Sequence, residues 1–244
     1  LGGPVVAAVV ATAGLRARLP GWWRTPRAAM VEAARRHADF PLLNTPHAFL
    51  GALQDTVSIA VIAHWLGPAA AGFWGLALRY LKAPATLVGA AVSHALYPAL
   101  AAAGEPTTAS RAELRRVMAV LAAIAVPLGA TLWLLGPWLF RTVFGEPWEA
   151  AGELARALAL YIGVHFVASP LSVVTLAWRA QAWALRLALV GQGLFVAALA
   201  SGLAIAGLEG AGWAVSGAML LYFGWFFWRL ATWPVVPDTE GAGG

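Results

Sequence analysis

The chain has 244 residues, of which 61% are hydrophobic and 11% are charged. With thirteen Trp and a mean hydropathy of +0.73, this composition excludes an ordinary soluble domain. The net charge of +5 does not indicate nucleic acid binding, because the arginines are sorted among the gaps between apolar runs. Anionic lipid headgroups are the better partner. The absence of Cys excludes disulfides and cysteine metal sites.

Six apolar windows are long enough to cross a membrane. A hydrocarbon core of about 30 Å requires roughly 20 apolar residues in a helix. The windows that meet this requirement are approximately 47–67, 70–98, 117–140, 152–178, 183–207 and 211–233. The sequence therefore predicts an all-α integral membrane protein, with a six-helix transmembrane lobe over residues 47–233.

A shorter apolar run, residues 1–15, is predicted to be the end of a truncated transmembrane helix that starts upstream of Leu1. It would supply the end of a seventh helix beside the six complete ones. A secretory signal is the alternative interpretation. The basic region of such a signal precedes its apolar stretch, whereas the arginines here follow it.

Residues 16–46 are predicted to form a basic cytoplasmic loop with an interfacial helix over residues 25–39. Thr25 can cap this helix. Pro41 and Pro46 are expected to break the chain before the first full span, because a proline removes a helical hydrogen bond.

Two later segments also have local signals. Ser110 and Glu113 have the spacing of a capping box, which predicts a cytoplasmic helix start before the third span. Residues 234–244 are rich in Gly and are predicted to be a disordered cytoplasmic tail.

The basic residues predict the orientation of the chain. Twelve of them lie in every second gap or near the end of the last span, whereas the intervening gaps contain only Arg141 and Arg156. This bias is the positive-inside pattern of membrane proteins. It places the connections 16–46 and 101–116 in the cytoplasm, and it places the following connections outside: 67–70, 141–152 and 207–211.

Two cations remain inside a predicted span. Arg79 and Lys82 each cost about 2.5–3.5 kcal/mol at the centre of a bilayer, so the pair requires an anion. Asp55 and Lys82 lie at equal sequence distances from the outer turn, about 18 Å along their helices. We therefore expect Asp55 to pair with Lys82, which leaves Arg79 for an anionic ligand of the phosphate type. The alternative is a purely structural pair, with Arg79 extending toward the membrane surface.

Other polar residues follow the helical period within the spans, and some of them accompany the charged pair. We predict a substrate-binding site formed by Gln54, Asp55, Arg79, Lys82, Thr86 and His165. The uncharged members could instead hold neighbouring helices together. His165 could relay protons or could simply be hydrogen-bonded.

Enzyme signatures do not occur in the sequence. It contains no HExxH, GxSxG, Walker A or dinucleotide-binding glycine pattern. The predicted outer loops are also short. The sequence therefore predicts a protein that is not an enzyme, with no catalytic residues, no metal site and no cofactor.

Three stretches carry a family resemblance. They are DFPLLNTP at 39–46, LGPAAAGFWGLALR at 66–79 with its continuation to VSHALYP at 92–98, and FGEPWEAAG at 144–152. In their order and spacing they resemble the oligosaccharide flippases of O-antigen and capsule biosynthesis. Those proteins belong to the multidrug/oligosaccharidyl-lipid/polysaccharide exporter superfamily.

The resemblance implies a protein of two six-helix lobes around a central cavity, of which this chain would be the C-terminal lobe. Its partners would be the missing N-terminal lobe, membrane lipids and an anionic lipid-linked oligosaccharide. The implied activity is flipping of polyprenyl-pyrophosphate-linked oligosaccharide across the bacterial cytoplasmic membrane by alternating access, with Arg79 and Lys82 binding the lipid carrier. A polytopic membrane enzyme acting on lipid-linked sugars and a structural membrane subunit are the alternatives.

Overall fold

The computed structural model describes residues 39–102 and 106–235, together with Ala29 and Glu32, and it describes side chains from Phe49 onward in the first of these ranges. The chain divides into two compact units, residues 1–42 and 43–244, and the fold described below is that of the second. The predicted Thr25 cap, the run 1–15 and residues 236–244 of the predicted tail lie outside the described residues.

Two helices form the first hairpin of this unit. Helix α3 spans Asp39–Leu66 and α4 spans Pro68–Leu81. The first span therefore starts earlier than the expected residue 47, and the helix continues through Pro41 and Pro46 instead of breaking there. Pro41 lies in the first turn, where a proline costs no hydrogen bond because the first N–H groups of a helix have no acceptor within it. Pro46 lies farther along, where it removes one helical hydrogen bond without ending the helix.

Helix α5, Ala83–Ala102, continues almost directly from α4. The two are separated at Lys82, whose backbone stays in the right-handed helical region at φ −81° and ψ −13°. Pro84 explains the interruption, because it has no N–H to donate to the carbonyl of Tyr80. The predicted second span is therefore two helices with a charged residue at their junction.

Helix α6 spans Thr108–Phe144 and starts with a capping box. The sequence predicted Ser110 as the cap residue, and this prediction is wrong by one turn. The N-cap is Thr107, whose side chain accepts a hydrogen bond from the Ser110 N–H at 3.1 Å, while the Ser110 hydroxyl accepts one from the Thr107 N–H at 2.9 Å. Serine thus replaces the usual Glu or Gln at the third position of the motif.

A short 3-10 turn, η2 at Glu146–Trp148, leads into helix α7, Glu149–Ala157. Close packing of α7 on α6 depends on glycine, because a Cβ on Gly152 would lie 2.5 Å from the Cα of Pro137. Pro137 cannot donate to the carbonyl of Trp133. The Nε–H of Arg156 donates to that carbonyl at 3.1 Å, so α7 satisfies the acceptor that the proline leaves free.

Helix α8 spans Ala159–Ala177, so the fourth span starts after Leu158 rather than at the expected residue 152. The break is explained by a side chain from another helix. The Ser216 hydroxyl donates to the Ala157 carbonyl at 2.6 Å and accepts from the Tyr161 N–H at 3.4 Å. In an uninterrupted helix those two backbone groups would bond each other, so the hydroxyl is inserted into the helical ladder.

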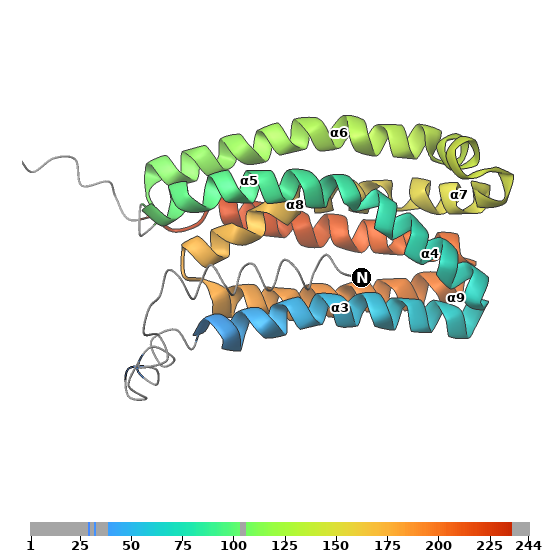
Figure 1. Ribbon diagram of the computed structural model, residues 1–244, viewed down its shortest axis with the longest axis horizontal. Helices are drawn as coiled ribbons and strands as arrows, with labels where there is room; N and C mark the ends of the chain where they lie inside the picture. The colour runs from blue at the N-terminus through green and yellow to red at the C-terminus, as the bar shows by residue number, and fades with distance from the viewer. Residues whose placement is uncertain (1–28, 30–31, 33–38, 103–105, 236–244) are drawn as a thin grey trace, which may run out of the picture. The chain divides into compact units, whose positions relative to one another are not determined.

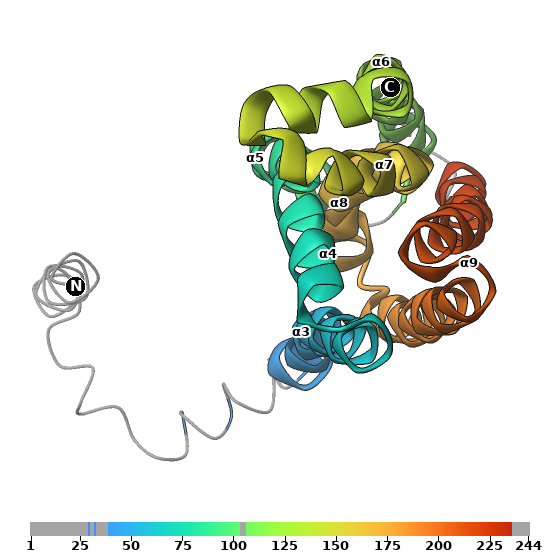
Figure 2. The same cartoon turned by 90° about the vertical axis from the view of Figure 1, so that its right-hand side faces the viewer.

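Helix α9, Gln181–Ala231, is interrupted where Ala206 and Gly207 leave helical geometry. Gly207 has a φ of 62°, which a side chain would make costly. The two arms then run back along each other, since the Tyr222 hydroxyl donates to the Leu187 carbonyl at 2.9 Å. Figure 2 shows the arms side by side.

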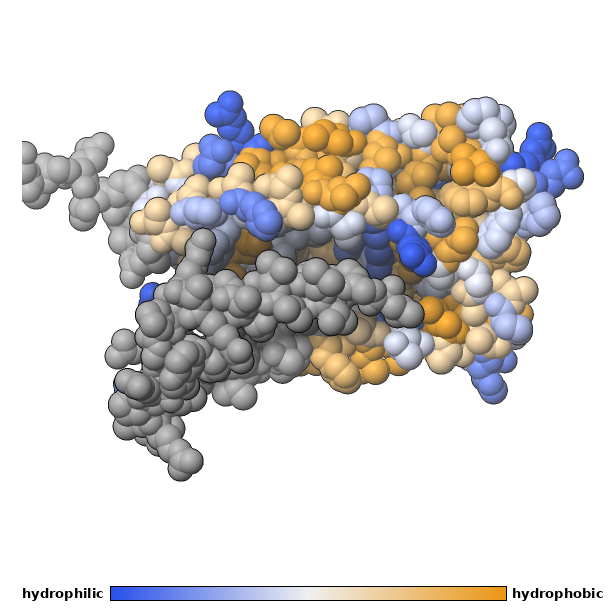
Figure 3. All heavy atoms as spheres, viewed as in Figure 1, coloured by the Kyte–Doolittle hydropathy of each residue, from blue (hydrophilic) through white to orange (hydrophobic). Residues whose placement is uncertain are grey.

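Five helices of the described part are long and apolar enough to cross a membrane. They are Phe49–Leu66, Pro68–Ala102, Thr108–Phe144, Ala159–Ala177 and Gln181–Ala231. The second of these contains α4 and α5 together, and the last contains both arms of α9. The protein is therefore an all-α membrane protein. On the face shown in Figure 3, apolar side chains cover much of the surface of the unit, and hydrophilic ones lie toward its two ends and at one place near its middle.

The connections alternate between the two ends of the unit. The α3–α4 and α6–α7 connections and the kink of α9 lie at one end, and the α5–α6 and α8–α9 connections lie at the other (Figure 1). This arrangement is the one that the alternating arginine-rich and arginine-poor gaps require.

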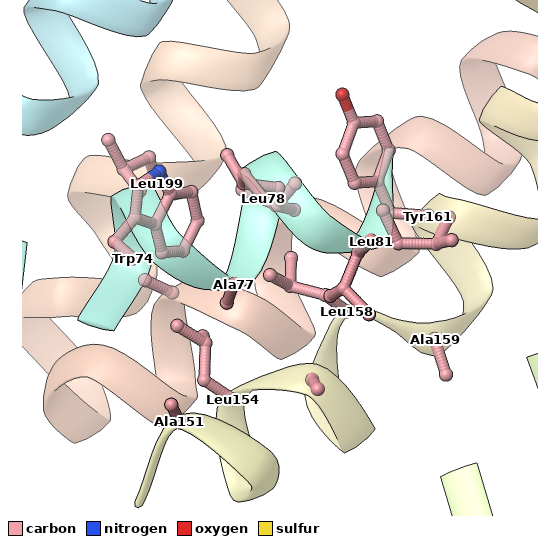
Figure 4. Packing of buried hydrophobic residues seen from close by; sticks show 14 of the residues in the cluster. Trp74, Ala77, Leu78, Leu81, Ala151, Leu154, Leu158, Ala159, Tyr161 and Leu199 are labelled. Carbon is pink, nitrogen blue, oxygen red and sulfur yellow. The ribbon is translucent and has the colours of Figure 1, made fainter. Parts of the chain in front are cut away.

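Buried apolar residues form two clusters. In the first, α4 packs against α7, α8 and α9 through Trp74, Ala77, Leu154 and Leu199, among others (Figure 4). The second joins α5, α6, α8 and the end of α9. Within a bilayer, such contacts stabilise the bundle through close packing, because lipid chains are as apolar as the side chains themselves.

Candidate functional site: a polar cavity in the bundle

A cavity of about 520 Å³ opens between α3, the α4–α5 junction, α8 and both arms of α9. Its polar lining residues are Gln54, Asp55, Lys82, Tyr161, His165, Ser169, Ser172, Thr175, Gln181, Gln192 and Tyr222. Ligand cavities of this size are usually mostly apolar, with a few polar groups that fix the orientation of the ligand. Polar groups in a membrane span must face such a cavity or another helix, because lipid cannot satisfy them.

The charged end of the cavity contains the predicted ion pair. The Lys82 Nζ lies 3.6 Å from the Asp55 Oδ1, which confirms the pairing expected from hairpin geometry. The side chain of Lys82 is 21% exposed and that of Asp55 is 57% exposed. The Lys82 ammonium also lies 5.7 Å from the centre of the Tyr161 ring, within the range of a cation–π contact.

Helix α8 positions the next two polar side chains. Tyr161 and His165 are one helical turn apart, and their ring centres lie 5.5 Å from each other. The His165 ring also contacts Phe223 of α9, at 6.4 Å between centres. Ser216 of α9 also interrupts the helix just before Tyr161. Contacts with α9 at Ser216 and at Phe223 therefore position the start of the polar face of α8.

The other end of the cavity is polar but uncharged. Ser172 and Thr175 each donate a hydrogen bond to a carbonyl three residues earlier in α8, at 2.9 Å, which leaves their oxygens able to accept. Gln192 instead lies one turn before Phe195 of α9, whose ring centre is 5.6 Å from that of Tyr161, and the Gln192 side-chain oxygen is buried with no hydrogen-bond partner among the described residues.

The structure brings four of the six predicted site residues together. Gln54, Asp55, Lys82 and His165 line the cavity, although they come from three different spans. Arg79 and Thr86 do not line it. Arg79 is exposed, and the Thr86 hydroxyl donates to the Ala83 carbonyl of its own helix at 2.7 Å. A ligand-binding role for Arg79 stays a prediction, made at a position outside this cavity.

Seven of the polar cavity residues were absent from the predicted set: Tyr161, Ser169, Ser172, Thr175, Gln181, Gln192 and Tyr222. Tyr161 belongs to the same helical stripe as His165, so the periodicity could have found it. Gln192 and Tyr222 lie in long apolar runs, where a single polar residue gives no pattern. Only the folding of α9 onto α8 reveals their position.

The arrangement offers a cation, a nearby carboxylate and uncharged hydrogen-bonding groups. Lys82 can bind an anion, and the neutral end can bind hydroxyl or amide groups. Among the residues that the structure describes, no group of three or more His, Asp or Glu side chains could hold a metal ion.

The fold and the site define the class first: a polytopic helical membrane protein with a polar, cation-containing cavity inside its bundle. A scan against family models then matches residues 3–153 to the family described as polysaccharide biosynthesis protein. The chain belongs to that family, and its membership supports a role in polysaccharide biosynthesis or export. Neither the curated proteins nor the solved structures give a match.

The region that matches the family includes part of the cavity lining. It contains α3 through most of α7, and therefore Gln54, Asp55 and Lys82. The walls formed by α8 and α9, including His165 and Gln192, lie beyond it. The charged end of the cavity thus falls within the family match and the neutral end does not.

Proposed function

We propose that the protein carries a polyprenyl-pyrophosphate-linked oligosaccharide from the inner to the outer leaflet of the bacterial cytoplasmic membrane. The observation that carries this proposal is a cavity among the candidate membrane spans whose cation, Lys82, lies in a chain of the polysaccharide biosynthesis family. Charge within a span is expensive and is generally kept for function. A pyrophosphate would supply the anion and a glycan would supply the hydroxyl groups.

In this proposal the two ends of the cavity bind two parts of one ligand. The pyrophosphate lies at Lys82, near Tyr161, and the first sugars lie toward Ser172 and Thr175. The protein then acts as a transporter and not as an enzyme, because no bond of the ligand has to break. Arg79, exposed one turn before Lys82, could meet the same ligand from outside this cavity in the complete transporter.

The proposed architecture has six complete spans and the end of a seventh. The two arms of α9 count as the fifth and sixth spans, since the chain reverses at Gly207. A second lobe, N-terminal to this one, would close the other side of the pathway. Alternating access would then come from rocking of one lobe against the other.

The test is polysaccharide export in a bacterial strain that lacks its own flippase. The gene is expressed with any coding sequence upstream of Leu1, as wild type and as Lys82→Gln. We expect Lys82→Gln to reduce surface polysaccharide at least about tenfold at equal protein level, because the ligand's charge would lose its partner. Glu149→Gln is the matched control, since Glu149 is an exposed partner of Arg141 at 3.9 Å, away from the cavity. Normal export by Lys82→Gln would rule out the proposed site.

A further inference from the structure

The two members of the ion pair in the cavity differ in how far they are enclosed by the protein. The side chain of Lys82 is mostly enclosed at the α4–α5 junction, beside the Tyr161 ring. The Asp55 side chain lines the cavity and is more than half exposed. Among the described residues, Asp55 has no charged partner other than Lys82. If one member of the pair moves when a ligand arrives, it is therefore Asp55.

Side chains of α3 close to Asp55 are more exposed, among the described residues, than those toward the hairpin. Phe49 and Leu53 on α3 are exposed, and a Cβ added to Gly51 would meet no atom within 4 Å. Toward the hairpin, in contrast, Ser58 and Ile62 are fully buried. Within the part of the chain that the structure describes, α3 is thus packed more closely at Ser58 and Ile62 than in the turn before Asp55.

From this asymmetry we infer that Asp55 is an internal anion that exchanges with the ligand on Lys82. In the empty cavity Asp55 neutralises Lys82, and in the loaded cavity the ligand's anionic group takes its place. When the ligand departs, Asp55 returns. Lys82 is then never left unpaired inside the membrane, where an isolated charge is costly. This inference rests on the proposed function and adds a mechanism of release to it.

The exchange predicts opposite effects on binding and on transport. Removing the carboxylate removes a competitor, so the anionic ligand binds more tightly and leaves more slowly. Transport then falls, because release and the return of the empty cavity both require Asp55. A purely structural role for Asp55 would instead weaken binding and transport together.

Binding is measured on the purified chain in nanodiscs, with farnesyl pyrophosphate as the probe. We expect Asp55→Asn to lower the Kd at least about tenfold, which is about 1.4 kcal/mol, and Lys82→Gln to raise it by a similar factor. In the double variant, Asp55→Asn should have no further effect, because the competition takes place on Lys82. Glu149→Gln adds the same charge change outside the cavity and should leave the Kd unchanged.

Transport is measured as surface polysaccharide, with the same variants in the expressed gene. We expect Asp55→Asn to export less than wild type at equal protein level, despite its tighter binding. Weaker binding by Asp55→Asn, or an equal gain with and without Lys82, would overturn the exchange while leaving the proposed function intact. An unchanged Kd for Lys82→Gln would overturn both.

Folding of each variant is checked by gel filtration and thermal unfolding after purification in detergent. Asp55→Ser replaces Asp55→Asn if the latter does not fold. If neither variant folds, Asp55 is a structural residue and the exchange is rejected.

Discussion

One hydroxyl group connects the packing of the bundle to the polar face of α8. Ser216 is fully buried on the second arm of α9, and its oxygen stands between the Ala157 carbonyl and the Tyr161 N–H. It thereby ends α7, starts α8 and sets the position of Tyr161 beside Lys82. A residue that touches no ligand can therefore decide the geometry of the cavity.

Ser216→Ala is expected to destabilise the protein by about 1–3 kcal/mol, because it leaves two buried backbone groups without their partner. The measurement is chemical or thermal unfolding of the purified chain in detergent. Ser201→Ala is the control, since the Ser201 hydroxyl is exposed and bonds only the Ala198 carbonyl of its own helix. Equal stability of the two variants would contradict the role given to Ser216.

The sequence alone could predict the Asp55–Lys82 pair but not the Ser216 insertion. Equal depth along a hairpin is a matter of counting residues, so the pair follows from local geometry. The choice of Ser216 as the partner of α8 depends on how α9 folds back. The cavity position of Gln192 has the same origin. Arg79 lies one turn from Lys82 but is exposed and away from the cavity, which the shared spacing of the two residues did not predict.

At the scale of elements, glycines allow the helices to approach one another closely. A Cβ on Gly202 would lie 2.6 Å from the Cα of Ala211, across the reversal of α9. The small residues therefore let the two arms of α9 meet near the turn. This is the usual means of helix association in membranes, where backbones approach at Gly and Ala.

Gly202→Val is expected to cost about 1–3 kcal/mol or more, because the added methyl groups overlap the facing backbone. Gly193→Val is a matched control on the same arm, since a Cβ there would meet no atom within 4 Å. Both variants replace a glycine with the same apolar side chain on the same helix, so they differ mainly in what the new side chain contacts. The unfolding midpoint of each variant is compared with that of wild type, and similar losses for both would refute close contact of the arms.

The sequence predicted which segments are helical but not where they break. The apolar runs fix the existence of the spans. The breaks at Lys82 and Leu158 came from a proline two residues ahead and from a hydroxyl on another helix. The Thr107 cap was missed because Ser110 also fits the cap position, and only the geometry shows which residue occupies it.

At the scale of the whole molecule, arginines and glutamates are distributed unequally between the two ends of the bundle. Arg115, near the start of α6, donates through its Nε–H to the Ala231 carbonyl at the end of α9, at 3.0 Å. This end also carries Arg179, in the α8–α9 connection. The opposite end carries Glu146 and Glu209. The fold class and this alternation were predictable from composition and spacing, because both are sums over many residues.

The topology predicted by this charge asymmetry can be measured directly, because the chain has no Cys. Single cysteines at positions 113, 146 and 209 are probed in intact cells with a thiol reagent that does not cross the membrane. We expect labelling at 146 and 209 and protection at 113, since the arginine-rich end lies in the cytoplasm. Labelling at 113 with protection at the other two positions would invert the assignment.

The central claim is that the cavity carries an anionic lipid from one leaflet to the other. Its most direct test is translocation in proteoliposomes containing a fluorescent polyprenyl-pyrophosphate sugar, with an impermeant quencher added outside. The protein is expressed with any coding sequence upstream of Leu1. We predict that wild-type protein exposes the inner-leaflet lipid to the quencher and that Lys82→Gln does not. Quenching limited to the outer leaflet with wild-type protein, or equal quenching with Lys82→Gln, would contradict the claim.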